Sequence, residues 1–129
     1  MFNKYGAYGA IHALLAVVLG AFAAHGLKDK LTEDMLDVFE TGVRYHMYHA
    51  IGLLLLALAA DRIGKNNNKL RWAARLMHLG IFLFSGSLYA LSLSGVDMLG
   101  IITPFGGLAF IVAWALAAHS IWKAKSSSE

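Results

Sequence analysis

Residues 5–24 read YGAYGAIHALLAVVLGAFAA, and this stretch carries no charged side chain. As an α-helix, about 20 residues cross the roughly 30 Å hydrocarbon core of a bilayer. The stretch is also longer than the apolar segment of a secretory signal peptide, which has about 7–15 residues, so a retained span is favoured over a cleaved leader. We therefore predict that this stretch forms a first transmembrane helix.

Three more apolar runs of similar length follow, at residues 43–60, 72–93 and 104–122. Hydrophobic residues make up 58% of the chain and charged residues 15%, whereas a soluble domain has about 45–50% and about 25%. One small soluble core cannot hide this surplus, so it has to face lipid. We predict an all-α membrane protein in which residues 1–129 form a single domain, an antiparallel bundle of four transmembrane helices.

Residues 32–41 differ from these runs because they are polar and acidic. Thr32 suits a helix N-cap, and Glu33 and Asp34 suit the positive end of the helix dipole in the first turn. Apolar side chains recur there at helical spacing, at Met35, Leu36, Phe39 and Val43. The pattern predicts an outer amphipathic helix that lies on the membrane surface and leads into the second span.

The basic residues predict the orientation of the bundle. With four spans, the N-terminus, the second loop and the C-terminal tail share one side of the membrane. That side carries Lys4, Arg62, Lys65, Lys69, Arg71, Arg75, Lys123 and Lys125, and the other side carries Lys28, Lys30 and Arg44. Because loops rich in Lys and Arg stay in the cytoplasm, we expect both termini to be cytoplasmic.

A polar cluster marks the outer end of the second span. Glu40 and Arg44 are spaced i, i+4 with the acid first, which favours an ion pair that would join the amphipathic helix to the span. Alternatively, the cluster binds an anion or a lipid headgroup. The residues of this predicted ligand site are Glu40, Arg44, Tyr45, Tyr48 and His49. Our leading hypothesis is a non-enzymatic bundle that binds a lipid, a small ligand or a partner.

Histidines offer a second chemistry. His46 and His49 are three residues apart and share a helix face, so with His25 of the first span they could hold a metal. Haem, held by two axial histidines, is the related alternative, and histidines also relay protons near neutral pH. The plainer interpretation is that they are hydrogen-bonded interface residues, so no cofactor is predicted. The absence of cysteine excludes thiolate ligands and disulfides.

The third span carries a polar stripe. Its members step by four, three, four and three residues, which places them on one helix face: His78, Phe82, Ser85, Tyr89 and Ser92. Hydroxyls inside lipid seek partners on other helices, so the stripe should face the bundle interior. It either packs there or lines a small pore. Small residues on the first span predict close helix contact, at Gly6, Ala10, Ala13, Ala16 and Gly20.

Few features indicate an enzyme. No Asp or Glu lies in the middle of a span, and no phosphate loop or His-Glu-x-x-His zinc motif is present. The remaining enzymatic alternative is a lipid-headgroup enzyme that uses Arg44 and a histidine.

Membrane lipids are the expected partners of the chain. A homo-oligomer would provide larger interfaces, and nothing in the sequence resembles a nucleic-acid-binding stripe.

Three stretches also resemble a known family. They are GAFAAHGL at 20–27, FETGVRYHMYHA at 39–50, and LFSGSLY at 83–89 continued by LGIITPFGG at 99–107. Over nearly its whole length the chain resembles the domain-of-unknown-function 423 family, also called uncharacterised protein family 0382. The resemblance implies a multi-pass protein of the bacterial cell membrane, and it implies no activity and no catalytic residues.

Overall fold

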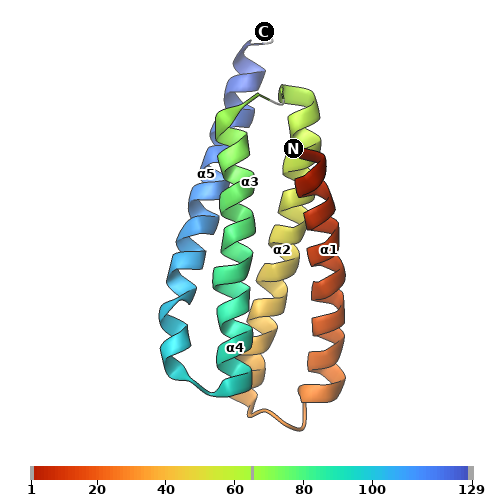
Figure 1. The fold of residues 1–129 in the computed structure, drawn as a ribbon, viewed down its shortest axis with the longest axis vertical. Coiled ribbons are helices and arrows are strands. Elements are labelled where there is room, and N and C mark those ends of the chain that lie inside the picture. Colours follow the sequence, from red (N-terminus) through yellow and green to blue (C-terminus); the bar gives the residue numbers. More distant parts are fainter. Residues whose placement is uncertain (1, 65, 128–129) are drawn as a thin grey trace.

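Four long helical segments run antiparallel side by side (Figure 1). The computed structural model describes residues 2–64 and 66–127. Its elements are α1 (Phe2–Phe22), η1 (Ala23–Leu27), α2 (Glu33–Ile63), α3 (Asn68–Gly80), η2 (Ile81–Gly86), α4 (Ser87–Ser94), η3 (Asp97–Ile101) and α5 (Thr103–Ser127). The segments long and apolar enough to cross a membrane are Asn3–Leu27, Glu33–Ile63, Asn68–Ser94 and Asp97–Ala124. The predicted four-helix membrane bundle is confirmed.

The connections follow the predicted topology. The start of α1, the turn between α2 and α3, and the end of α5 lie at one end of the bundle, and the other two connections lie at the opposite end (Figure 1). Each span is longer than its apolar run because capping residues and polar turns extend it. Thr32 caps α2 by accepting a hydrogen bond from the Met35 amide at 3.2 Å, as the sequence indicates.

The separate outer amphipathic helix is not confirmed. Residues 33–41 are the first turns of α2, which continues to Ile63 as one helix along the bundle. The apolar face of these turns packs on protein rather than on the membrane surface, because Phe39 is buried against Ala23 and Leu27 of η1. A helix of 31 residues is about 46 Å long, so α2 exceeds the thickness of the hydrocarbon core.

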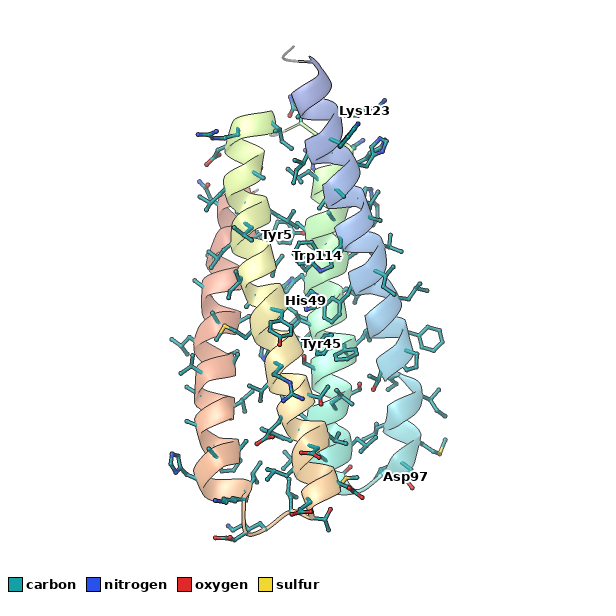
Figure 2. All side chains as sticks on the ribbon, turned by 180° about the vertical axis from the view of Figure 1, so that it is seen from behind. Tyr5, Tyr45, His49, Asp97, Trp114 and Lys123 are labelled. Carbon is teal, nitrogen blue, oxygen red and sulfur yellow. The ribbon has the colours of Figure 1, made fainter. Side chains whose placement is uncertain are left out.

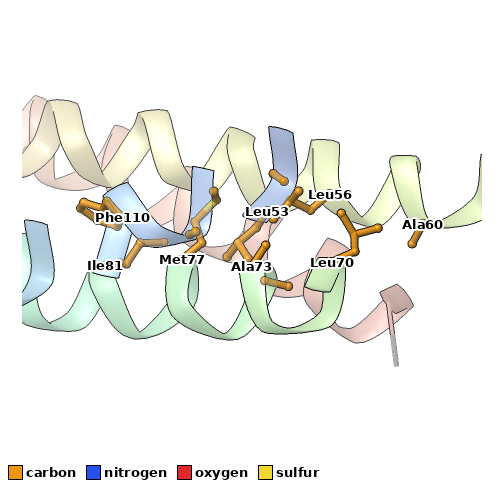
Figure 3. Packing of buried hydrophobic residues seen from close by; sticks show 11 residues of the cluster. Leu53, Leu56, Ala60, Leu70, Ala73, Met77, Ile81 and Phe110 are labelled. Carbon is orange, nitrogen blue, oxygen red and sulfur yellow. The ribbon is translucent and has the colours of Figure 1, made fainter. Parts of the chain in front are cut away.

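The main apolar core lies between α2, α3 and α5 (Figure 3). Leu53 of α2, together with Leu70 and Met77 of α3, is fully buried. Alanines at Ala73, Ala74, Ala113 and Ala117 fill the positions between the larger side chains. Small residues allow helix axes to approach closely, which is the main source of packing energy inside lipid.

Large apolar side chains cover the outside. Leu14, Leu58 and Ile111 each expose more than 60% of their surface. Such a surface is unfavourable in water and fits a helix that faces acyl chains. The side chains on the outward faces of α1 and α5 are apolar as well. Hydrophobicity therefore does not reveal which faces of these two helices point into the bundle.

Two wider π-helical turns interrupt the spans, at η1 and at η2. Such turns add one residue to the hydrogen-bonded loop, so they change the face that the following residues present, and they often occur at functional sites. In η2, Ser85 is fully buried and donates a hydrogen bond to the Gly42 carbonyl at 2.7 Å. Gly106 of α5 lies against the backbone of the same turn.

Candidate functional site: an aromatic groove and a histidine chain

Three residues of the predicted ligand site line a groove between α2 and α5. Tyr45, Tyr48 and His49 form one wall. Figure 2 shows Tyr45, His49 and Trp114 one above another along the gap between the two helices. The groove has a volume of about 510 Å³ and is further lined by Phe84, Gly107, Phe110, Ile111 and Trp114. This volume falls within the range of about 300–1,000 Å³ that is typical of small-molecule sites.

His49 supplies an imidazole to this groove, beside the hydroxyls of Tyr45 and Tyr48 and the indole N–H of Trp114. Its Nδ1 lies 2.7 Å from the Tyr45 carbonyl oxygen, so Nδ1 donates and the Nε2 of the neutral ring is left as an acceptor. The ring stacks on Phe110 with centroids 3.5 Å apart and planes 5° apart. Within the described structure Nε2 has no hydrogen-bond partner.

Glu40 and Arg44 do not join this groove. The predicted ion pair is also not formed between these two described side chains; the Arg44 guanidinium instead donates to the Thr41 hydroxyl at 3.1 Å. Exposed i, i+4 pairs contribute only about 0.3–0.5 kcal/mol, so a nearby hydroxyl competes easily. Thr41 in turn donates to the Asp37 carbonyl at 2.8 Å.

A chain of hydrogen bonds forms the second polar region. His78 Nε2 lies 3.0 Å from His12 Nε2, His12 Nδ1 lies 2.9 Å from His46 Nε2, and His46 Nδ1 lies 2.9 Å from the Tyr89 hydroxyl. His12 and His46 are buried, whereas His78 and Tyr89 are half-buried. The chain therefore links α1, α2 and the third span through the inside of the bundle.

Glycines bring the members of this chain together. A Cβ on Gly9 of α1 would lie 2.7 Å from the Ala50 carbonyl oxygen, which shows how closely α1 approaches α2 next to His12. A Cβ on Gly42 would lie 2.9 Å from the Tyr89 ring, so this glycine leaves space for the tyrosine beside His46. Close contact of the first span is thus present where the chain forms, although Gly9 is not a member of the predicted small-residue stripe.

The predicted polar stripe of the third span supplies two members of the chain. His78 and Tyr89 bond to His12 and His46, Ser85 bonds to α2, and buried Ser92 donates to the Tyr89 carbonyl at 3.0 Å. Phe82 departs from the stripe, since 57% of its surface is exposed. It lies in the wider π turn, where the four-three spacing no longer describes one face.

The predicted metal triad is not assembled. His25 is exposed on η1, while His46 turns toward α1 and His49 turns toward α5. No group of three His, Asp or Glu side chains in the described part of the chain is placed to hold a metal ion. His12 and His46 are already in hydrogen-bond contact, which leaves no room for a haem iron between them.

Sequence reasoning missed His12 as a member of the site, and it also missed the α5 wall of the groove. His12 lies four residues before Ala16, a member of the predicted small-residue stripe, so helical spacing already placed it near the face that meets another helix. Nothing local signals Phe110 or Trp114, because they reach His49 from about 60 residues away. Only the packing of α5 on the bundle reveals them.

Comparison with known proteins agrees with this architecture. Residues 19–107 match the family model described as "Protein of unknown function (DUF423)". The chain belongs to the DUF423 family. The matched range includes His46, His49, His78 and Tyr89, whereas His12 and the groove residues that follow Gly107 on α5 lie outside it.

Relatives of this DUF423 chain are membrane proteins by name. The UPF0382 membrane protein YwdK of Bacillus subtilis is 54% identical over 84% of this chain and 87% of its own length. A UPF0382 membrane protein of Staphylococcus epidermidis is 47% identical over 82% and 84%. One of Haemophilus influenzae is 41% identical over 98% and 99%. No solved structure matches the chain significantly.

Proposed function

We propose that this DUF423 protein binds a single-chain membrane lipid that carries a hydroxyl group, in the groove between α2 and α5. The observation that carries this proposal is the unpartnered Nε2 of His49, which lies in an otherwise aromatic and aliphatic groove. A hydroxyl that reached Nε2 would donate the one hydrogen bond that the groove can accept there. Polar groups of this kind fix the orientation of ligands in apolar sites.

The position of the groove supports a ligand that arrives from the membrane. Tyr48, Ile111 and Trp114 expose 55%, 67% and 43% of their surfaces along its rim. A groove that opens sideways on a lipid-facing surface is reached by acyl or prenyl chains before any water-soluble compound. Aromatic walls provide a large apolar contact area for such a chain.

The same proposal includes a location. The named relatives come from bacteria, and the excess of Lys and Arg at the end that holds both termini supports a cytoplasmic position for that end. We place the protein in the bacterial cell membrane with membrane lipids as its partners. A homo-oligomer stays a prediction, to be checked by the mass of the particle in lipid.

Two matched lipids test the proposal. Farnesol carries a prenyl chain and one hydroxyl donor, whereas farnesyl methyl ether carries the same chain without the donor. Native mass spectrometry of the protein released from detergent would count the molecules retained. We expect the wild type to retain one farnesol and at least tenfold less of the ether.

Two variants complete the experiment. His49→Phe keeps a ring to stack on Phe110 but removes Nε2, so it should retain both lipids equally weakly. Gly107→Leu should fill the groove, because a Cβ there meets the Phe84 ring only at an ordinary 3.8 Å. Equal retention of farnesol and ether by the wild type, or unchanged farnesol retention by His49→Phe, would show that the groove is not such a site.

A further inference from the structure

The three hydrogen bonds of the histidine chain must all run in the same direction. His12 and His46 each use both ring nitrogens, one toward each neighbour. A neutral imidazole has one N–H donor and one acceptor nitrogen. If His78 donates to His12, then His12 must donate to His46 and His46 to Tyr89, and if Tyr89 donates, every bond reverses. The direction of one bond therefore sets the direction of all three.

We propose that the His78–His12–His46–Tyr89 chain conducts protons along the interior of the bundle. A proton binds His78 at Nδ1, and His78 passes the proton on its Nε2 to His12 Nε2. His12 passes its Nδ1 proton to His46 Nε2, and His46 passes its Nδ1 proton to the Tyr89 oxygen, while Tyr89 releases its own hydroxyl proton to water. One proton enters, one leaves, each N–H bond that breaks is matched by one that forms, and no net charge remains.

The chain runs past the middle of the third span, Asn68–Ser94. His78 and Tyr89 are eleven residues apart in the third span, which is about 16 Å along a helix axis and about half of the hydrocarbon core. Both end members are half-buried, whereas the two middle members are buried. The middle of the chain is therefore shielded, and a proton reaches or leaves it through His78 and Tyr89.

The groups that face the chain leave it neutral. At the His78 end, α1 contributes Tyr8, stacked on His78 at 4.8 Å, Tyr5 at 6.2 Å, and Lys4, whose ammonium lies 5.8 Å from the Tyr8 ring. At the other end Phe39 of α2 lies 4.9 Å from the Tyr89 ring. No Asp or Glu occurs in residues 1–28, 41–60 or 62–96, and the three hydrogen bonds of the chain join only histidine and tyrosine side chains, so no carboxylate bonded to the chain holds the proton as a fixed ion pair.

The geometry also distinguishes conduction from metal binding. A metal needs one nitrogen from each histidine directed at a common point, whereas His12 lies between its two neighbours and turns one nitrogen toward each. After a proton has passed, all three rings carry their N–H on the opposite nitrogen. They must turn back before the next proton can follow, so conduction in one direction should be slow and sensitive to packing around α1.

Proton flux into vesicles tests this proposal. The full-length protein is reconstituted into vesicles of phosphatidylcholine and phosphatidylglycerol that contain the pH-sensitive dye pyranine, and a potassium gradient with valinomycin drives proton entry. We expect at least tenfold faster acidification than in empty vesicles. His12→Gln keeps an amide that hydrogen-bonds but cannot exchange its proton between two ring nitrogens, so its flux should fall to the level of empty vesicles.

Two further variants provide a second test of the chain and a control outside it. Tyr89→Phe removes a single oxygen from the end of the chain and should also abolish the flux, even if His12→Gln fails to fold. His119→Gln changes an exposed histidine of α5 outside the chain and should conduct like the wild type. Wild-type vesicles that acidify no faster than empty ones, or a folded Tyr89→Phe that conducts normally, would overturn the proposal, whatever the groove binds.

Discussion

The two sides of α2 are held by different interactions. Toward α3 and α5, Leu53 and Leu56 pack into an apolar cluster with Met77 and Phe110. Toward α1 and α4, the same helix presents His46 and the Gly42 carbonyl, which form hydrogen bonds to histidine, tyrosine and serine. The apolar side is held by the close fit of its side chains. The polar side is held by hydrogen bonds that need specific histidine, tyrosine and serine groups. We therefore assign stability and the proposed lipid binding chiefly to the first side, and the proposed proton transfer to the second.

The largest expected effect comes from adding one methyl group where α5 packs on η2. Gly106→Ala would place a Cβ 2.4 Å from the Phe84 amide nitrogen and 2.8 Å from its Cα. Because both atoms belong to the backbone of η2, the helices must separate, and we expect a loss of about 3 kcal/mol, the upper end of the usual overpacking cost. Unfolding in mixed micelles with increasing SDS would measure it.

The neighbouring glycine is the matched control. Gly107→Ala adds the same methyl group where the nearest atom is a Phe84 ring carbon at 3.8 Å. This variant should be as stable as the wild type. If the two alanine variants unfold at the same SDS fraction, the close approach of α5 to η2 is not present in the membrane.

The same methyl group on the polar side should act differently. In Gly42→Ala the added Cβ lies 2.9 Å from Tyr89 Cε1, which is part of a side chain that can move. We expect a smaller stability loss of about 1 kcal/mol but a displaced tyrosine ring and a weakened bond to His46. Flux in the vesicle assay should fall more than stability does. A variant that loses stability without losing flux would contradict the division between the two sides.

Sequence alone predicts the four spans because about 20 apolar residues are needed to cross lipid, and this length is visible in each run. It also predicts the cluster of Tyr45, Tyr48 and His49, because residues three and four apart share a helix face. The sequence cannot predict which face of each helix packs against which neighbouring helix. Val17 and Ala16 are adjacent and both apolar, yet Val17 faces outward and Ala16 is buried. The partners of His12 and His49 therefore emerge only from the fold.

A hydroxyl deletion probes the bond between η2 and α2. Ser85→Ala removes the donor to the Gly42 carbonyl, and interhelical hydrogen bonds inside membranes contribute about 0.6 kcal/mol on average. We expect a loss of that size in the same SDS titration, with Ser94→Ala as the control, because this exposed serine bonds locally to the Ala90 carbonyl and the Val96 amide and not to another span. A loss several times larger would mean that hydrogen bonds, not packing, hold the polar side together.

The smallest effect is expected at the outer end of α2. Glu40→Gln should change stability by less than about 0.5 kcal/mol, as is usual for surface substitutions away from specific contacts, because Arg44 bonds to Thr41 and not to Glu40. The comparison is with Thr41→Val, which removes the observed partner of Arg44. If Glu40→Gln is the more damaging of the two, the ion pair expected from the sequence forms in the membrane.

Nitrogen NMR tests the histidine chain most directly. With ¹⁵N-labelled histidine in lipid bilayers, a hydrogen bond between two ring nitrogens produces a scalar coupling across the bond. We predict such a coupling between His12 and His46, lost in His12→Gln, with one protonated and one unprotonated nitrogen in each ring. Folded protein whose His12 and His46 nitrogens show no coupling, or whose rings resonate as isolated imidazoles, would contradict the chain on which the account rests.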